Sequence, residues 1–231
     1  MEIKNKTVLI TGGSTGIGKA TAQEFIKRGA KIIILGMNKP KYNCEFQKVN
    51  ISKEEEIKKA LAKIDSIDII KNNEEIEKIE KIEETSTAIL NEMIDINFKG
   101  LFWVCKYSLP KIKSGGCIIN ISSLAGIKSF EGLGVYCATK AAVISLTKTL
   151  ALELKDKKIR SNSIAPGIIE TEIWEKMYGN KGKSMLNEFK ESTLVKRAGK
   201  PEEIAHAAIF LVENEFITGS IVNVDGGEIA L

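Results

Sequence analysis

Tyr136 and Lys140 are four positions apart in a stretch with helical periodicity that runs from Tyr136 to Leu154. Side chains four apart share one face of a helix, and a cation beside a phenol favours the phenolate, so the phenol can exchange protons nearer neutrality. Ser123 precedes Tyr136 by thirteen positions and follows the apolar run 117–119. One strand end and one loop would bring its hydroxyl alongside. The pattern indicates a proton-transfer site, although Tyr-x-x-x-Lys alone is more often a chance helix pattern.

A glycine-rich turn near the N-terminus is the second chemical signal. The short strand pattern Thr7–Ile10 leads into Gly12, Gly16 and Gly18, and a helical pattern follows. Glycines let the backbone approach a pyrophosphate, and the first turn of a helix offers unpaired N–H groups to an anion. A strand, a glycine turn and a helix in this order predict a dinucleotide-binding turn, and a plain strand-to-helix connection is the weaker reading.

The end of the second expected strand, Lys31–Leu35, leaves the choice between NAD and NADP open. In dinucleotide-binding folds, an acidic residue about twenty positions after the glycines binds the ribose 2′-hydroxyl. Gly36 and Met37 occupy this place, and no acid is near them. The sequence therefore does not support exclusive use of NAD. Lys39 could favour a 2′-phosphate, or it could be a solvated loop lysine.

Strand and helix patterns alternate along the whole chain without linkers or repeats. This predicts an α/β fold: a single Rossmann-like, doubly wound parallel sheet of about seven strands with helices on both faces. We expect one domain over residues 1–231, with a mobile substrate-side segment at 170–191. The connection after the second strand contains Pro40 and has little room for a helix. Expected helices include 53–64, a short surface helix at Glu74–Glu84, a long helix at Leu90–Lys111, and one opening at Pro201.

Composition excludes several classes of function. The net charge is +4, and Lys and Glu are interleaved rather than clustered, so we expect no nucleic-acid partner. No signal peptide is recognised, and no apolar run approaches a membrane span, so no membrane association is expected. The four cysteines lack C-x-x-C spacing, which favours a reducing, cytoplasmic location. His206 is the only histidine, so a His-dependent triad or a His-rich metal site is not expected.

With these residues laid out, the chain resembles the short-chain dehydrogenase/reductase family from Thr7 to Gly227. The turn Thr11-Gly12-Gly13-x-x-Gly16-Ile17-Gly18 is similar to the family's cofactor turn. Asn97, Ser123, Tyr136 and Lys140 match its catalytic tetrad in order and approximate spacing. Further landmarks are Pro166-Gly167 with Thr171, the segment 201–205, and the closing Asp225-Gly226-Gly227.

The resemblance implies hydride transfer between a nicotinamide (NAD or NADP) and a small alcohol or carbonyl substrate. Tyr136 would exchange the hydroxyl proton, while Lys140 would lower the Tyr136 pKa and hold the nicotinamide ribose. Ser123 would bind the substrate oxygen, and Asn97 would order a water that relays protons to Lys140. Beside Tyr136 and Lys140, the implied cofactor-binding residues are Gly12, Ser14, Thr15, Gly16, Ile17, Gly18, Gly36, Met37, Asn50, Ile51, Asn72, Pro166, Gly167, Ile169 and Thr171.

The chain departs from the family's pattern most clearly after Asn72-Asn73. The family usually has Ala-Gly there, where the backbone passes close to the cofactor, and this chain has Glu74-Glu75. Two acids at this place could clash with a dinucleotide or repel it. Lys71 replaces an apolar strand residue and could pair with a nearby acid. Asn50 stands where an Asp commonly contacts the adenine, and an amide can still form that hydrogen bond.

Three functions remain open. The short connection after the second strand resembles that of sugar and dihydrodiol dehydrogenases of the family, which favours a sugar or polyol substrate. The general pattern also resembles 3-oxoacyl-thioester (acyl-carrier-protein) reductases, which usually carry a basic residue where Met37 stands. A catalytically weak or inactive ligand sensor or interaction protein is the alternative of another class; Glu74 and Glu75 motivate it, and the intact tetrad argues against it.

Assembly into a homo-oligomer, a dimer or a homotetramer, is also implied by the resemblance. The stretches Leu90–Lys111 and Tyr136–Leu154 are apolar over wide faces, and in this family the corresponding helices pair across a two-fold axis. The alternative is that both helices only cover the sheet.

Overall fold

The computed structural model covers residues 1–231. Its seven strands form one parallel sheet in the order β3-β2-β1-β4-β5-β6-β7. The predicted doubly wound α/β sheet of about seven strands is therefore confirmed. The strands are β1 (Thr7–Thr11), β2 (Lys31–Gly36), β3 (Glu45–Lys48), β4 (Ile67–Asn72), β5 (Ile112–Ile121), β6 (Arg160–Pro166) and β7 (Ile221–Val224).

Eight α-helices connect or flank these strands. They are α1 (Gly16–Lys27), α2 (Glu54–Ala62), α3 (Thr87–Ile94), α4 (Leu101–Ser108), α5 (Gly134–Glu153), α6 (Ile173–Tyr178), α7 (Gly182–Phe189) and α8 (Pro201–Glu213). A π-helical turn (Asp95–Gly100) joins α3 to α4. Single 3-10 turns lie at Leu109–Lys111, Leu124–Gly126, Lys155–Lys157, Gly179–Lys181, Lys190–Ser192 and Glu228–Ala230.

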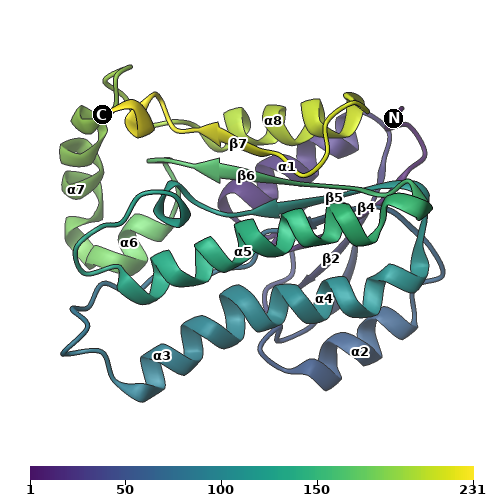
Figure 1. Cartoon of the computed structure of the whole chain (residues 1–231), viewed down its shortest axis with the longest axis horizontal. Coiled ribbons are helices and arrows are strands. Elements are labelled where there is room, and N and C mark those ends of the chain that lie inside the picture. Colours follow the sequence, from purple (N-terminus) through teal and green to yellow (C-terminus); the bar gives the residue numbers. More distant parts are fainter.

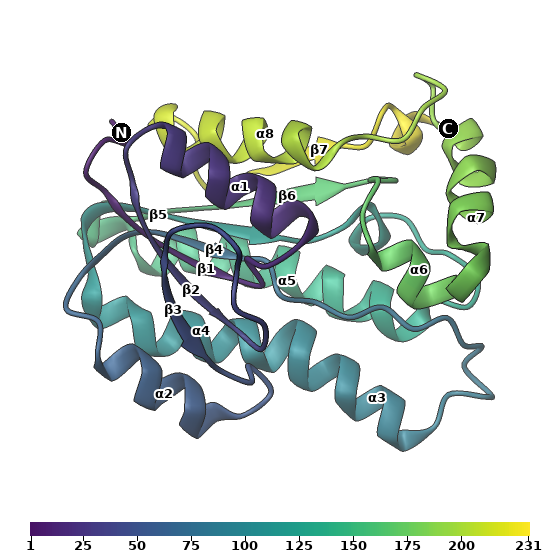
Figure 2. The same ribbon diagram turned by 180° about the vertical axis from the view of Figure 1, so that it is seen from behind.

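The helices divide between the two faces of the sheet. Helices α1 and α8 lie together on one face, and α2, α4 and α5 cover the other (Figure 1; Figure 2 shows the same arrangement from behind). The apolar core divides in the same way: one cluster includes Phe25 of α1 and Ile209 of α8, and the other includes Leu61 of α2 and Val143 of α5. Both faces of the central strands are covered, which explains why all of β4 is buried.

Helix α5 is long and apolar enough to cross a membrane by length and composition alone, which the sequence analysis did not anticipate. Its buried residues include Tyr136, Lys140 and Val143, and Val143 packs in the core cluster under the sheet. A core helix of a globular protein passes the same test because its buried face is apolar.

Two expected helices differ from the structure. Residues Glu74–Glu84 do not form a helix; the chain is irregular there and ends in a turn at 82–84. The amide of the Asn97 side chain binds both the N–H and the C=O of Ile76, at 2.9 Å and 2.8 Å, so these backbone groups are unavailable for a helical ladder. The long helix expected at Leu90–Lys111 exists, but it begins at Thr87 and contains the π-helical turn around Asn97.

Segment 170–191 forms α6 and α7 rather than an irregular loop, and both helices lie beyond one end of the sheet (Figure 1). Three aromatic rings hold the pair together, with Trp174 stacked on Tyr178 at 6.1 Å and tilted against Phe189 at 5.6 Å. These rings line a cavity at the site described below. The substrate-side role and the mobility of the segment stay predictions.

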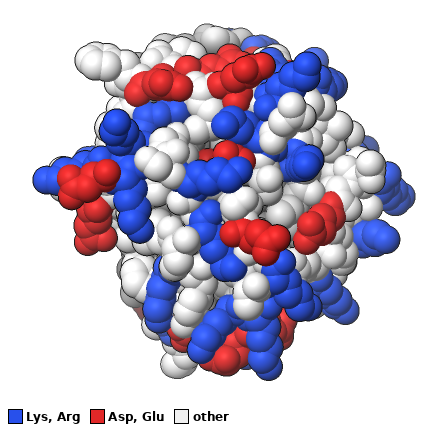
Figure 3. Space-filling view, turned by 90° about the vertical axis from the view of Figure 1, so that its right-hand side faces the viewer, with Lys and Arg blue, Asp and Glu red and all other residues white.

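The opposite end of the molecule carries charge of both signs. Figure 3 shows this face with lysine and arginine side chains spread over it and acidic side chains between them. At the start of β4, Asp68 pairs with Lys113 at 3.1 Å and with Lys6 at 3.6 Å. The interleaving of charges read from the sequence thus holds on this surface.

Candidate active site

The residues with acid–base potential meet at the carboxyl end of the sheet. Lys140 is 2% exposed on α5, and its ammonium donates to the Ile121 carbonyl at the end of β5 at 3.1 Å. The same nitrogen lies 5.4 Å from the centre of the Tyr136 ring, one turn earlier on the helix. The shared helix face predicted from the four-residue spacing is therefore present. A cation and a phenol are held together in a buried environment.

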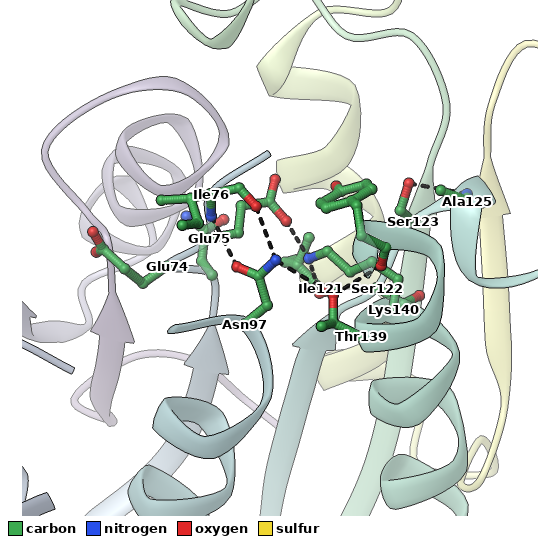
Figure 4. Close-up of polar contacts among 12 residues, drawn as sticks. Glu74, Glu75, Ile76, Asn97, Ile121, Ser122, Ser123, Ala125, Thr139 and Lys140 are labelled. Carbon is green, nitrogen blue, oxygen red and sulfur yellow. Dashed lines mark hydrogen bonds and ion pairs between the residues drawn. The ribbon is translucent and has the colours of Figure 1, made fainter. Parts of the chain in front are cut away.

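Glu75 changes the electrostatics of this pair. Its carboxylate forms an ion pair with the Lys140 ammonium, a contact that Figure 4 shows directly. The pKa of Tyr136 lies well above its ordinary value because the phenol is buried, and the charges of Glu75 and Glu77 raise it further; the Ser123 hydroxyl acts in the opposite direction. In this arrangement the negative charge of Glu75 balances the positive charge of Lys140. The raised pKa of Tyr136 favours the protonated phenol.

Ser123 lies at the end of β5, where its side-chain oxygen accepts a hydrogen bond from the Ala125 N–H at 3.1 Å. Ser123 and Tyr136 line the same cavity. Its neighbour Ser122 points into the core and donates to the Ile164 carbonyl at 3.0 Å. The structure therefore brings Ser123, Tyr136 and Lys140 together at one site.

Asn97 lies near these residues but is engaged with the backbone. Its amide clamps Ile76 and also donates to the Thr139 hydroxyl at 3.3 Å on α5. The π-helical turn that contains Asn97 interrupts the regular helix, a feature often found at functional sites. Asn97 therefore fixes the segment after β4 against the catalytic helix; its role in a proton relay stays a prediction.

The glycine turn borders a groove of about 430 Å³ that runs from Gly12 to the segment after β4. Gly12 and Gly16 have positive φ angles of 67° and 50°, which favour glycine. At Gly18 a Cβ would lie 2.1 Å from the Gly12 carbonyl oxygen, so only glycine lets α1 begin this close to the turn. No side chain caps the N-terminus of α1 at Thr15, and its first N–H groups are free for an anion.

The predicted cofactor residues divide between two cavities. Gly12, Ser14, Thr15, Gly16 and Ile17 line the groove. Pro166, Gly167 and Ile169 line an adjoining cavity of about 160 Å³ at Tyr136, to which Ile17 and Thr171 also contribute.

Seven predicted cofactor residues lie outside the lining of these cavities: Gly18, Gly36, Met37, Asn50, Ile51, Asn72 and Lys140. Asn72 turns into the core and donates to Asn120 Oδ1 at 2.8 Å, while the next residue, Asn73, lines the groove. Ile51 is buried in the core, and Asn50 uses its side-chain oxygen to accept from Ser52 in its own turn. Met37 is half-exposed just after β2.

The residues around the end of β4 that differ from the family's usual pattern make different contacts. Lys71 is fully buried and donates to Asn73 Oδ1 at 2.5 Å rather than forming an ion pair with an acid. Asn73 in turn donates to the Gly12 carbonyl at 3.2 Å, so the end of β4 is tied to the glycine turn. Glu74 and Glu75 leave the chain in opposite directions: Glu75 points to Lys140, and Glu74 points toward the N-terminal strands (Figure 4).

The cavity at Tyr136 contains residues that the sequence analysis did not identify. Trp174, Tyr178 and Phe189 line it from α6 and α7, and Glu77 and Glu228 line it as well. Burial raises the pKa of Glu77 to about 7, and the neighbouring Glu75 charge adds to this. The alternation of Glu and Ile in 74–84 predicts a surface helix and gives no indication that Glu77 lines a cavity.

These residues fit a dinucleotide. The groove provides a glycine turn with close backbone approach, free N–H groups at α1 and a buried, unpartnered oxygen on Glu74. One flexible side chain must give way, because the Glu75 carboxylate occupies the Lys140 ammonium that would otherwise hold a ribose hydroxyl. Displacement of Glu75 from Lys140 is therefore the local change that a bound nicotinamide nucleotide requires.

Comparisons with known proteins agree with this geometry. The family model described as Enoyl-(Acyl carrier protein) reductase matches residues 12–228. The chain is 35% identical to the 3-oxoacyl-(acyl-carrier-protein) reductase FabG of Chlamydia muridarum over 244 residues, which covers 96% of this chain and 97% of the relative. The FabG protein of Thermotoga maritima is 32% identical and is covered to 99%.

Solved structures also superpose on nearly the whole chain. The ligand-free aldohexose dehydrogenase of Thermoplasma acidophilum superposes with a TM-score of 0.94 at 31% identity, covering 99% of this chain and 96% of that one. The protein ElxO with NADP bound superposes with a TM-score of 0.87 at 32% identity, covering 98% and 100%. The match extends over the whole sheet, the glycine turn and the helix that carries Tyr136 and Lys140. The chain belongs to the short-chain dehydrogenase/reductase family and is an NAD(P)-dependent oxidoreductase.

Proposed function

We propose that this oxidoreductase interconverts a small polyhydroxylated alcohol, of the sugar or polyol class, and its carbonyl form. The observation that carries the proposal is the lining of the cavity at Tyr136. Aromatic rings of Trp174, Tyr178 and Phe189 lie on one side, the carboxyl groups of Glu77 and Glu228 are available as hydrogen-bond partners, and no lysine or arginine is present. Aromatic faces with a few polar groups suit a hydroxylated carbon chain.

The protein's own groups would handle the proton. Hydride transfer between the carbinol carbon and the nicotinamide is the chemistry that the bound cofactor supplies. Ser123 would donate to the substrate oxygen, and Tyr136 would take the hydroxyl proton in oxidation or return it in reduction. Lys140, once separated from Glu75, would lower the pKa of Tyr136 by its charge and bind the nicotinamide ribose.

A substrate screen tests this proposal. The protein is assayed with NAD⁺ and NADP⁺ against aldohexoses, pentoses and linear polyols, following absorbance of the reduced nicotinamide. We expect turnover with at least one hydroxylated substrate and loss of this turnover in Tyr136→Phe. Turnover of simple apolar alcohols alone, with none of the hydroxylated compounds accepted, would contradict the substrate class.

Reduction of a 3-oxoacyl thioester is the second candidate. The curated relatives named above carry that activity in their names, and the cavity also contains apolar groups such as Leu133, Ile173 and Met177. An acetoacetyl thioester with NADPH or NADH distinguishes the two candidates. Efficient reduction of the thioester, with sugars inert, would favour the reductase.

A cytoplasmic location and assembly into a dimer or homotetramer remain proposals. Leu152 and Phe102 on the two long helices are exposed in the single chain, which supports pairing through those helices. Light scattering of the purified protein at micromolar concentration tests the assembly, and a monomer would contradict it.

A further inference from the structure

The Glu74 side chain reaches the place where the second strand ends. A Cβ built on Gly36, the last residue of β2, would lie 3.5 Å from Glu74 Oε2, and one built on Gly12 would lie 2.6 Å from the same oxygen. This oxygen is buried and has no hydrogen-bond partner. An orphaned carboxylate oxygen is costly unless something satisfies it, so this position calls for a donor that the chain does not provide.

The order of the strands explains how an acid in the segment after β4 reaches the end of β2. Strand β1 lies between β2 and β4, and its terminal glycine turn has no side chain to separate them. The Thr11 hydroxyl accepts from the N–H groups of Asn73 and Glu74, at 2.9 Å and 3.1 Å, which holds the Glu74 backbone against this turn. The side chain then extends across Gly12 toward Gly36.

Dinucleotide-binding folds use an acid at the end of the second strand to bind the adenosine ribose 2′-hydroxyl. This chain has none in that stretch. Building on the proposed function, we infer that Glu74, from the segment after β4, replaces this acid, accepts hydrogen bonds from the adenosine ribose hydroxyls, and makes the enzyme selective for NAD(H) over NADP(H).

The charges around the position argue against a 2′-phosphate. A phosphate attached at the 2′-oxygen would lie against the Glu74 carboxylate, and two like charges in a buried site repel. Lys39, the residue in the following loop that could have favoured a phosphate, is exposed and does not line the groove. Lys176 of α6 lines the groove and moderates the Glu74 pKa, which burial raises.

The test measures binding without catalysis. The full chain is titrated calorimetrically with NADH, NADPH, ADP-ribose and 2′-phospho-ADP-ribose, and so are Glu74→Gln, Glu74→Ala and the control Glu75→Gln. Circular dichroism establishes that each variant is folded. We expect NADH and ADP-ribose to bind the unaltered chain at least about tenfold more tightly than their 2′-phosphorylated counterparts, since a charged acceptor to a hydroxyl strengthens the hydrogen bond.

The variants test whether Glu74 causes the preference for ligands without a 2′-phosphate. Glu74→Gln and Glu74→Ala should bring the two affinities within about threefold, whereas Glu75→Gln should leave their ratio unchanged. Equal affinity of the unaltered chain for both series, or an unchanged ratio in both Glu74 variants, would overturn this assignment while leaving the proposed oxidoreductase intact. Failure of all four probes to bind a folded sample would overturn both. If Glu74→Gln does not fold, Glu74→Ala decides.

Discussion

Glu74 and Glu75 are adjacent residues with opposite surroundings, and the difference divides the groove into two ends. Glu74 carries a buried oxygen with no partner beside the glycine turn, whereas Glu75 forms an ion pair with Lys140 at the catalytic end. The adenosine end therefore offers an unused acceptor, and the catalytic end has its cation already neutralised. The first end is prepared for a ligand, and the second must rearrange to receive one.

Tyr136→Phe should have the largest effect, and it should affect the two ends of the groove differently. It removes the proton carrier from the catalytic end and leaves the adenosine end unchanged. We expect kcat to fall by about 10²–10⁴-fold, the usual contribution of general acid–base catalysis, while NADH affinity changes little. Steady-state kinetics and a fluorescence titration on the same sample measure the two effects. An inactive ligand sensor would keep its function in this variant, so an unchanged biological output would support that alternative.

Lys71→Met tests the buried charge on β4, the strand that precedes Glu74 and Glu75. Burial lowers the pKa of Lys71 to about 7, whereas the unfolded lysine keeps its ordinary value near 10.5. The unfolded chain thus binds more protons between pH 7 and 10.5, and stability from this group rises with pH across that window. We expect the variant to raise the free energy of unfolding by about 1–4 kcal/mol at pH 6–7, and by less near pH 10.

Urea unfolding at several pH values measures this difference. Lys99→Met is the matched control, because Lys99 is half-exposed and pairs with Asp95 on the surface at 2.7 Å. The control should change stability by no more than about 0.5 kcal/mol. A destabilised Lys71→Met at neutral pH would instead show that the bond to Asn73, which ties β4 to the glycine turn, outweighs the cost of burying the charge.

Glu75→Gln tests whether the catalytic end must rearrange to bind a cofactor. It removes the negative charge that pairs with Lys140. We expect affinity for NADH and NADPH to rise together by about tenfold, since a charge-assisted contact no longer competes for the ammonium. Glu84→Gln, an exposed residue in the turn of the same segment, serves as the control and should leave both affinities unchanged. Weaker cofactor binding in Glu75→Gln would mean that Glu75 assists the nucleotide instead of competing with it.

The same variant should also shift the pH profile. The Glu75 charge is the second cause, after burial, of the raised Tyr136 pKa. Its removal lowers that pKa, and the phenolate needed for alcohol oxidation then forms at lower pH. The rising limb of the oxidation rate should move toward lower pH in Glu75→Gln, as measured by kcat against pH. A shift in the other direction would contradict the assigned electrostatics.

The sequence predicted the fold and the catalytic helix well because these depend on local patterns. The seven strands follow buried apolar runs, and the Tyr136–Lys140 spacing determines a shared helix face wherever α5 lies. The prediction of a helix at 74–84 was wrong because a long-range contact determines the backbone there. Asn97, 21 positions beyond Ile76, binds its backbone and prevents the helix that the Ile and Glu pattern suggested.

The position of Glu74 could not be predicted for a similar reason. The sequence rule places the acid at the end of β2, but in the sheet only β1 separates β2 from β4. Proximity across β1 depends on the non-sequential strand order, which no local pattern reveals. The aromatic cover from Trp174 and Phe189 was missed because the helices α6 and α7 pack through three rings that are spread over sixteen positions.

Titration of the purified full chain with NADH, followed by nicotinamide fluorescence, tests the central claim most directly. The account predicts saturable binding at neutral pH, because the groove fits a dinucleotide and the flexible Glu75 side chain can leave Lys140. No binding to a folded sample, in the unaltered chain and in Glu75→Gln alike, would contradict it and would favour a protein that has kept the fold for another purpose.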